Sequence, residues 1–186
     1  PSQGLSSRWG VMPLSSTQDE AGPLARSVTD LATVLDLTVG FDPQDAATAV
    51  MQSRLAPDFS ARLGTVSLQG LRIGVLDLWM DAAEPAMREV LDAAMASLRA
   101  QGAELQSFSL QNMDALLAAS GLIGLEFETD LNAWLADFGS EDFPTLQSIV
   151  DAGLHHPVVH NVLSNSLRGP RDETAYEEAM VARERL

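Results

Sequence analysis

Hydrophobic residues recur at the spacing of an amphipathic helix in an early stretch of the chain. Five apolar positions lie three or four residues apart, which is one face of a helix: Leu24, Val28, Leu31, Leu35 and Val39. Ser27 precedes Asp30 by three residues, a hydroxyl and an acid arranged as at a helix start. Gly40 suits the C-terminal cap. The pattern therefore predicts a helix that ends near Gly40, after a short strand at Trp9–Leu14 that breaks at Pro13.

The clearest predicted unit follows residues 46–69, which lack strong periodicity and indicate a loop with broken helical turns. Residues 71–76 form a short run rich in β-forming side chains, and residues 103–110 form another. Between them, residues 84–101 have amphipathic helical spacing, with Pro85 in the first turn and Gly102 at the end. A strand, a helix and a strand with short joints predict a βαβ crossover with parallel strands. The fold class is therefore predicted to be α/β.

Helical patterns dominate the rest of the chain. Residues 113–138 have helical spacing, weakened locally by Gly121 and Gly124. Residues 144–153 predict a short helix. A last helix is expected from about Glu173, with Thr174 and Glu177 as a capping box. Trp134, Leu135 and Phe138 are interpreted as helix packing rather than a platform for a substrate.

The composition narrows the possible chemistry. The 186 residues suit one domain or part of a larger one. There is no cysteine, and all 11 basic residues are arginine, so this chain supplies no disulfide, no thiolate nucleophile and no catalytic or phosphate-binding lysine. No apolar run approaches the roughly 20 residues of a membrane helix. The net charge of −15 argues against nucleic acid or anionic lipid as a partner. Adaptation to high salt, or a GC-rich genome that favours arginine, would explain the acidic, lysine-free composition.

The ends of the chain suggest an excerpt. It begins at Pro1 and stops at Leu186 inside a predicted helix, so we expect a central portion of a single domain, 1–186, cut at both ends. The sequence leaves compartment and oligomeric state open. A cytoplasmic location is favoured over a secreted or periplasmic one, and a homodimer stays an option.

Histidines and clustered acids are the first candidates for chemistry. His156 and His160 are four residues apart, with His155 beside them, but a metal site needs a third ligand and the glutamate of an HExxH motif is missing. We therefore expect no metal. The acid groups Glu126/Glu128/Asp130 and Glu177/Glu178 could be paired catalytic carboxylates; in so acidic a chain, solvated helix faces explain them better.

Ser15 and Ser16 are the candidate nucleophiles. No histidine is near them in sequence, no GxSxG elbow surrounds either residue, and an unactivated serine is a poor nucleophile. From the residues alone, they are predicted to be turn residues.

The segment that contains these serines closely resembles the amidase signature family. Residues 4–48 read GLSSRWGVMPLSSTQDEAGPLARSVTDLATVLDLTVGFDPQDAAT, a long, ungapped match to that family's SRxGIxPLSxSxQDTxGPMART stretch and the GxDPxDPAT that follows. Further matches are LQGLRIGV (68–75), FETDLNAW (127–134) and the closing helix, and these lean towards the peptide-amidase-like branch. The departure Glu20-Ala21 adds a charge where relatives often have threonine and a small residue.

The resemblance implies a mixed β-sheet between helices and hydrolysis of a small-molecule or peptide carboxamide without a cofactor. Catalysis in the family uses a Ser–Ser–Lys triad that lies upstream of the matched segment. This chain has no lysine and no GGSxR stretch, so no catalytic residue is carried over and the 186 residues alone are expected to be inactive. The carried-over residues are expected to lie behind the active site and position it: Ser16, Gln18, Asp19, Gly22 and Pro23.

Two other interpretations stay open. One is a non-catalytic binding or scaffold module derived from the same fold. The other is the glutamine-dependent transamidase subunit of the family, although its SLDxxGP motif differs from Thr17-Gln18-Asp19 here.

Overall fold

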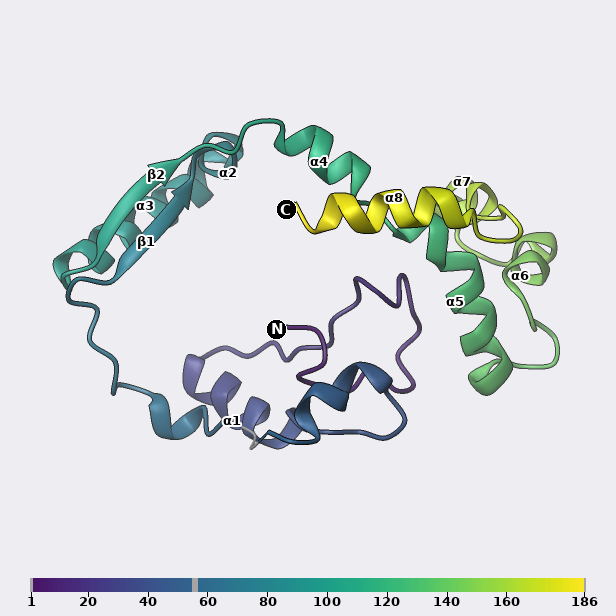
Figure 1. Cartoon of the computed structure of the whole chain (residues 1–186), viewed down its shortest axis with the longest axis horizontal. Helices are drawn as coiled ribbons and strands as arrows, with labels where there is room; N and C mark the ends of the chain where they lie inside the picture. Colours follow the sequence, from purple (N-terminus) through teal and green to yellow (C-terminus); the bar gives the residue numbers. More distant parts are fainter. Residues whose placement is uncertain (1, 55–56, 186) are drawn as a thin grey trace. The chain divides into compact units, whose positions relative to one another are not determined.

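The chain divides into two compact units, each described here by itself. A computed structural model describes residues 2–54 and 57–185 (Figure 1). Unit 1 comprises Pro1–Ser60 and Asp114–Leu186, and unit 2 comprises Ala61–Met113. The segment that resembles the amidase signature lies in unit 1, and the predicted βαβ crossover lies in unit 2.

Unit 2 is a strand–helix–strand crossover. Strands β1 (Arg72–Leu76) and β2 (Glu104–Phe108) pair in parallel, with Arg72 opposite Glu104 and Leu76 opposite Phe108. Helix α3 (Pro85–Ala100) connects them, preceded by a short helix α2 (Asp77–Ala82) that the sequence did not predict. The α/β class and the parallel βαβ unit are thereby confirmed.

The ends of α3 follow from two residues. Pro85 occupies the first turn, where backbone N–H groups have no acceptor within the helix, so the N–H that proline lacks costs no hydrogen bond. Gly102 has φ 92°, a left-handed conformation that favours glycine, and a Cβ there would lie 2.3 Å from Oε1 of Gln69. The amide of Ala103 then donates to the carbonyl of Leu98 and directs the chain into β2. Pro85 and Gly102 therefore set the start and end of α3, as predicted.

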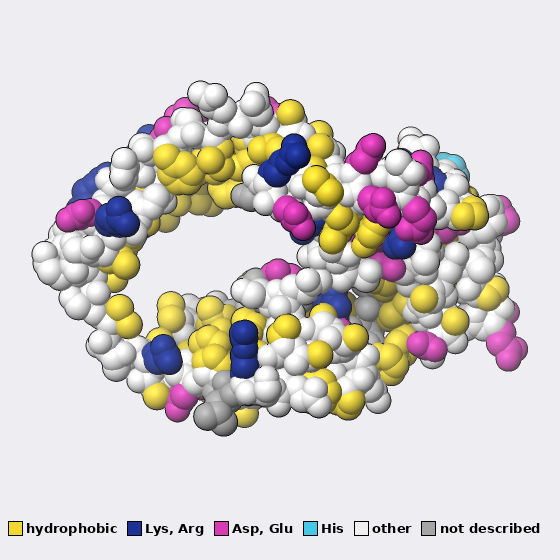
Figure 2. Space-filling view, viewed as in Figure 1, with side chains coloured by type: hydrophobic (Ala, Val, Ile, Leu, Met, Phe, Trp, Pro, Cys, Tyr) yellow, Lys and Arg dark blue, Asp and Glu magenta, His cyan; other side chains and the backbone are white. Residues whose placement is uncertain are grey.

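Unit 2 leaves much of its apolar surface exposed. Among its described residues, Ala103 is the one buried hydrophobic side chain. Figure 2 shows hydrophobic side chains gathered around α2. Large apolar side chains that remain exposed in this unit include Leu71, Trp79, Met87, Val90 and Phe108. The unit is thus held by its backbone pairing and by partial burial more than by a closed core.

Unit 1 is mainly helical. Its amino-terminal part carries α1 (Val28–Thr38) and the 3-10 turn η1 (Ala46–Met51), and η2 (Ser60–Arg62) follows at the border with unit 2. The remaining elements are α4 (Met113–Ala119), α5 (Ile123–Phe138), α6 (Leu146–Ala152), η3 (Pro157–Val159), α7 (His160–Asn165) and α8 (Glu173–Arg183).

The core of unit 1 lies between α5 and α6. Four buried side chains form it: Phe127, Leu131, Leu135 and Leu146. Leu163 and Leu167 are among the partly buried residues packed against this cluster. Oδ1 of Asn132 accepts the amide of Leu146 at 2.8 Å, which joins the start of α6 to α5. Helix α5 is therefore fixed on one side by apolar contacts, and other faces remain for polar contacts.

Several sequence predictions need correction. Trp9–Leu14 is a loop rather than a strand, because polar contacts of Arg8 and Asp19 shape it. Ser27 does cap α1, with its hydroxyl accepting the Asp30 amide at 3.1 Å. The helix starts at Val28, so Leu24 lies outside it and is fully exposed.

Three further helix ends also differ from the prediction. Helix α1 ends at Thr38, and its C-cap residue is Val39, in extended conformation, rather than Gly40. The predicted helix over 113–138 breaks into α4 and α5 around Gly121. Asp172 caps α8 by accepting the Ala175 amide, so the predicted capping box at Thr174 and Glu177 was wrong.

Candidate functional site

Asp19 builds the loop that contains the two candidate serines. Its Oδ2 accepts the amide of Leu14 at 2.7 Å and that of Ser15 at 3.0 Å. The amide of Asp19 donates in return to the carbonyl of Ser15 at 2.8 Å. A carboxylate that accepts two backbone N–H groups from nearby residues closes a tight turn. Asp19 therefore fixes the backbone of residues 14–19, which we call the signature loop.

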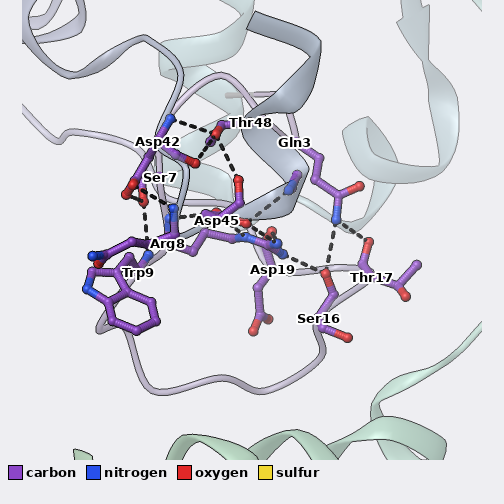
Figure 3. A network of polar contacts seen from close by, with 12 residues as sticks. Gln3, Ser7, Arg8, Trp9, Ser16, Thr17, Asp19, Asp42, Asp45 and Thr48 are labelled. Atoms are coloured by element: carbon purple, nitrogen blue, oxygen red, sulfur yellow. Dashed lines mark hydrogen bonds and ion pairs between the residues drawn. The ribbon is translucent and has the colours of Figure 1, made fainter. Parts of the chain in front are cut away.

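Arg8 holds the signature loop from the other side (Figure 3). Its Nη1 donates to the carbonyls of Ser16, at 2.5 Å, and Asp19, at 3.3 Å. The rest of the guanidinium forms a two-pronged pair with Asp45, with Nε and Nη2 at 3.1 and 3.0 Å from the two carboxylate oxygens. This geometry matches the planar fork of arginine to a carboxylate.

The Arg8–Asp45 pair is electrostatically strong. The hydrogen bond from Arg8, opposed by burial, lowers the pKa of Asp45 to about 2. The Asp45 carboxylate also accepts the backbone amide of Arg8 at 2.8 Å and that of Ala47 at 3.1 Å. Asp45 stays ionised throughout the neutral range and keeps Arg8 in place beneath the loop.

Glu126 of α5 is the buried anchor of the signature loop. Its side chain is 1% exposed. One carboxylate oxygen accepts the Ser15 hydroxyl and the Thr17 amide, the latter at 3.1 Å. The other accepts the Thr17 hydroxyl and the hydroxyl of Tyr176 from α8, at 3.0 Å. The loop, α5 and α8 are thus joined through one carboxylate.

The donors around Glu126 also decide its charge. Burial raises the pKa of the Glu126 carboxyl, but the hydrogen bonds from Ser15, Thr17 and Tyr176 outweigh burial, so the pKa lies below its usual range. Such a carboxylate is a weak base. Ser15 is itself completely buried, with its hydroxyl directed to Glu126. Ser15 is therefore neither activated nor accessible to a substrate, in agreement with its interpretation as a turn residue.

Sequence reasoning missed Glu126, because it was grouped with the solvated helix faces. One signal could have found it: Glu126 and Asp130 lie four residues apart on α5 and so share a face. Oδ2 of Asp130 accepts the amide of Ser16 at 2.6 Å. Glu128 lies elsewhere on the helix and accepts the amides of Arg168 and Gly169 at 2.7 and 2.8 Å. The acid cluster is structural rather than simply solvated, and it is not a catalytic pair.

The five residues predicted to support the active site fall into two places. Ser16, Gln18 and Asp19 lie together in the signature loop, where Oε1 of Gln18 accepts the Leu122 amide at 2.8 Å just before α5. Gly22 and Pro23 line a different cavity of unit 1, beside Ser6 and α1. Whether these residues serve an active site stays a prediction.

An aromatic cleft opens beside the signature loop. Its volume is about 360 Å³. The rings of Trp9 and Phe138 meet edge to face with centroids 4.8 Å apart, and Trp134 lies 5.4 Å from Phe138. Ser16 and Asp19 contribute to its lining, together with Arg8, Gly10, Val11, Pro13, Gln44, Asp45, Asp130, Ala133 and Asp137. Leu135 packs in the core as predicted, whereas Phe138 faces this cleft.

The histidines form a pair other than the one considered from sequence. Nε2 of His155 lies 2.9 Å from Nδ1 of His160, with the two rings stacked. His156 instead accepts the amide of Val158 and caps η3. Within residues 2–54 and 57–185, no three histidine, aspartate or glutamate side chains are grouped as a metal site requires. No helix in that part of the chain is long and apolar enough to cross a membrane.

The comparisons with known proteins agree with the motif in the signature loop. The amidase family model matches residues 1–186, and the chain belongs to that family. The chain is 39% identical over 120 residues to a glutamyl-tRNA(Gln) amidotransferase subunit of Pseudomonas fluorescens, covering 64% of this chain and 24% of that protein. The corresponding protein of Methylococcus capsulatus is 38% identical over 114 residues, 61% of this chain and 23% of that protein.

Solved structures match over the whole chain. The native peptide amidase of Stenotrophomonas maltophilia has a TM-score of 0.72 at 30% identity, covering 100% of this chain and 39% of its own. The structure described as PAM12A has a TM-score of 0.80 at 31% identity, covering 98% and 38%. An amidase family protein from Bacillus anthracis shares the fold with a TM-score of 0.80 at 24% identity, covering 100% and 37%. The chain spans about a quarter of the length of the curated relatives that it matches in sequence.

Proposed function

We propose that the chain is the central portion of an amidase that hydrolyses a carboxamide to a carboxylate and ammonia or an amine. The observation that carries this proposal is the hydrogen bonding of the signature loop. Its family motif residues Ser16, Gln18 and Asp19 bond to Arg8, Asp130 and nearby backbone amides, and buried Glu126 accepts the backbone amide between Ser16 and Gln18. Buried polar groups that are fully hydrogen-bonded define one backbone geometry. A loop fixed in this way is suited to position catalytic groups.

The reacting groups are proposed to lie outside these 186 residues. In the family's reaction a serine hydroxyl attacks the amide carbonyl, and a lysine acting through a second serine removes its proton. The C–N bond breaks as the nitrogen takes that proton, and water then hydrolyses the acyl-enzyme. Backbone N–H groups beside the nucleophile stabilise the oxyanion. This chain has no lysine, and Ser15 is buried against Glu126, so its contribution is to position those groups.

A small carboxamide or a C-terminal peptide amide is the proposed substrate. The solved structures that match this chain at 30% identity or more include the peptide amidase from Stenotrophomonas maltophilia. A transamidase subunit is the second candidate, favoured by the 39% identity to the tRNA amidotransferase subunit of Pseudomonas fluorescens. The net charge of −15 favours the first, because a tRNA-bound substrate needs cationic contacts.

The test compares two proteins: the 186-residue chain, and the longest polypeptide whose reading frame includes it. Ammonia release is measured from a dipeptide amide and from glutamine. We expect the longer protein to hydrolyse the dipeptide amide and the 186-residue chain to release none. Turnover by the 186-residue chain alone would contradict the proposal, and release from glutamine alone would favour the transamidase. A longer protein without any amidase activity would favour the non-catalytic module.

A matched pair of variants tests the positioning role of Asp19. In the longer protein, Asp19→Ala leaves two loop amides without an acceptor, and we expect kcat to fall by roughly 100-fold, the cost of displacing catalytic groups by about 1 Å. The control is Asp114→Ala, at an exposed carboxylate of α4. A rise in KM with unchanged kcat would mean that Asp19 contacts substrate rather than positions the loop.

A further inference from the structure

We propose that the aromatic cleft beside the signature loop binds a positively charged organic group, a guanidinium or alkylammonium, carried by the amide substrate. The designation of this group as part of a substrate rests on the proposed amidase function. The charge preference of the cleft does not, because it follows from the residues that line it.

The first observation is an aromatic wall that the fold leaves open. Trp9 is 48% exposed and Phe138 is 40% exposed, although their rings contact each other at 4.8 Å. Trp134 continues the wall on α5. Ring faces of this kind attract cations electrostatically. The wall therefore offers a surface on which a flat guanidinium can stack.

The second observation is the charge of the lining. One arginine and four aspartates line the cleft, which gives a net charge of −3. Arg8 is already neutralised by its ion pair with Asp45. Asp19 and Asp130 each accept backbone amides of the signature loop. Asp137 makes no hydrogen bond or ion pair with the described residues, so its carboxylate is available to a ligand.

The third observation is the end of α5. Ala133, Trp134, Asp137 and Phe138 belong to its last turns, and Phe138 is its final residue. The C-terminal end of a helix carries partial negative charge and favours cations, yet no basic side chain lies in this last turn. Asp137 adds a further negative charge there. A bound cation would offset both, whereas an anion would be repelled.

Together these features favour one class of occupant. A cation with an apolar stem could stack on the rings and pair with Asp137, while a neutral group of the same shape gains the apolar contacts alone. Ser16 and Asp19 also line the cleft, so the charged group would lie next to the signature loop. The inferred substrate is an amide with a basic side chain.

The test is isothermal titration calorimetry of the longer protein with n-butylguanidinium and with its neutral isostere n-butylurea. Neither probe needs to be turned over, so the result is independent of catalysis. We expect n-butylguanidinium to bind at least fivefold more tightly, with a preference that shrinks as ionic strength rises. The variant Asp137→Asn should reduce that preference two- to fivefold, whereas Asp142→Asn, at an exposed aspartate outside the cleft, should leave it unchanged.

Equal affinity for the two probes, or no binding of either, would overturn the inference, as would a preference that Asp137→Asn leaves intact. A second measurement separates it from the proposed function. Kinetics with argininamide and citrullinamide should show kcat/KM about tenfold higher for the basic amide. Hydrolysis of both at equal rates would support the proposed amidase function and contradict cation binding in the aromatic cleft. A preference for guanidinium in calorimetry without any hydrolysis would support cation binding in the cleft and contradict the proposed amidase function.

Discussion

The two units of this chain are stabilised in different ways. Unit 1 connects segments far apart in sequence through buried polar groups, as where Ser15, Thr17 and Tyr176 meet on Glu126. Unit 2 is a short parallel crossover whose strands pair in simple register, and large apolar side chains such as Trp79 and Val90 stay exposed. Unit 1 is therefore held by side-chain contacts between residues far apart in sequence. The structure of unit 2 follows from the succession of a strand, a helix and a strand along the chain.

This difference bears on where function lies. Buried polar networks cost free energy unless every member is satisfied, so they occur where one geometry matters. The signature loop has such a network, and it is also the segment that carries the family motif. A two-stranded sheet is a marginal structure on its own, and unit 2 contributes none of the residues that line the aromatic cleft. The proposed positioning role is therefore assigned to unit 1.

The largest effect is expected from Glu126→Gln. Glutamine keeps the shape but replaces one acceptor oxygen with a donor, which then faces the hydroxyls of Thr17 and Tyr176 or that of Ser15. We expect the free energy of unfolding to fall by about 3 kcal/mol, as for other broken buried charge networks. Urea unfolding measures it. The control Glu178→Gln, an exposed acid of α8, should change it by less than about 0.5 kcal/mol; equal effects of the two variants would contradict the network.

Asp45→Asn is expected to cost about 2 kcal/mol at neutral pH, because Arg8 loses its charged partner. Acid should have a related effect on the unmodified protein. Since the pKa of Asp45 is lowered to about 2 from 3.8, its contribution is present above about pH 4 and is lost as pH falls towards 2. The lowered pKa of Glu126 acts in the same direction. Urea unfolding between pH 5 and about 2 should show a weaker pH dependence in Asp45→Asn; an identical dependence would show that Asp45 is not the titrating group.

Tyr176→Phe should have a smaller effect. It removes one of the donors to Glu126 and leaves the aromatic ring, over which the Arg171 guanidinium lies at 4.0 Å. A hydrogen bond to a charged group contributes about 1.5–3 kcal/mol, and we expect the low end of that range because this bond is only partly buried. Because the two side chains interact, Tyr176→Phe should cost less in a Glu126→Gln background than in the unmodified protein. Additive losses in this double-mutant cycle would show that the two residues are not coupled.

The smallest effect is expected in unit 2. Val90 on α3 is 64% exposed, so Val90→Thr should change the free energy of unfolding by less than about 0.5 kcal/mol. Thermal or urea unfolding measures it. A loss above 1.5 kcal/mol, near the range for a fully buried side chain, would mean that this face of α3 is covered in solution.

The sequence predicted unit 2 better than unit 1, for a physical reason. The crossover depends on local features, the apolar runs of residues 71–76 and 103–110, Pro85 and Gly102, and these are visible in short windows. The Trp9–Leu14 loop was mistaken for a strand because its conformation depends on distant partners of Arg8, above all Asp45. Tertiary contacts of that kind override local preference.

The candidate site shows the same limit. The motif identified Ser16, Gln18 and Asp19, and the structure does bring these residues together. Glu126 had one signal, its four-residue spacing to Asp130, but that spacing does not reveal burial, because the burial of Glu126 depends on a loop more than 100 positions earlier in the sequence. An acid in so acidic a chain carries no sign in the sequence that it is 1% exposed. The acidic composition describes the surface, and it does not distinguish the buried carboxylates of Asp45 and Glu126 from the many exposed acids.

The central claim is that the signature loop positions an amidase active site and does not supply its nucleophile. The most direct test is to treat the longer protein with a fluorophosphonate, which modifies activated serines, and to map the modified residue by mass spectrometry. The account predicts a single labelled serine outside residues 1–186, and a loss of labelling in Glu126→Gln measured under conditions where that variant is folded. Labelling at Ser15 or Ser16 would contradict it.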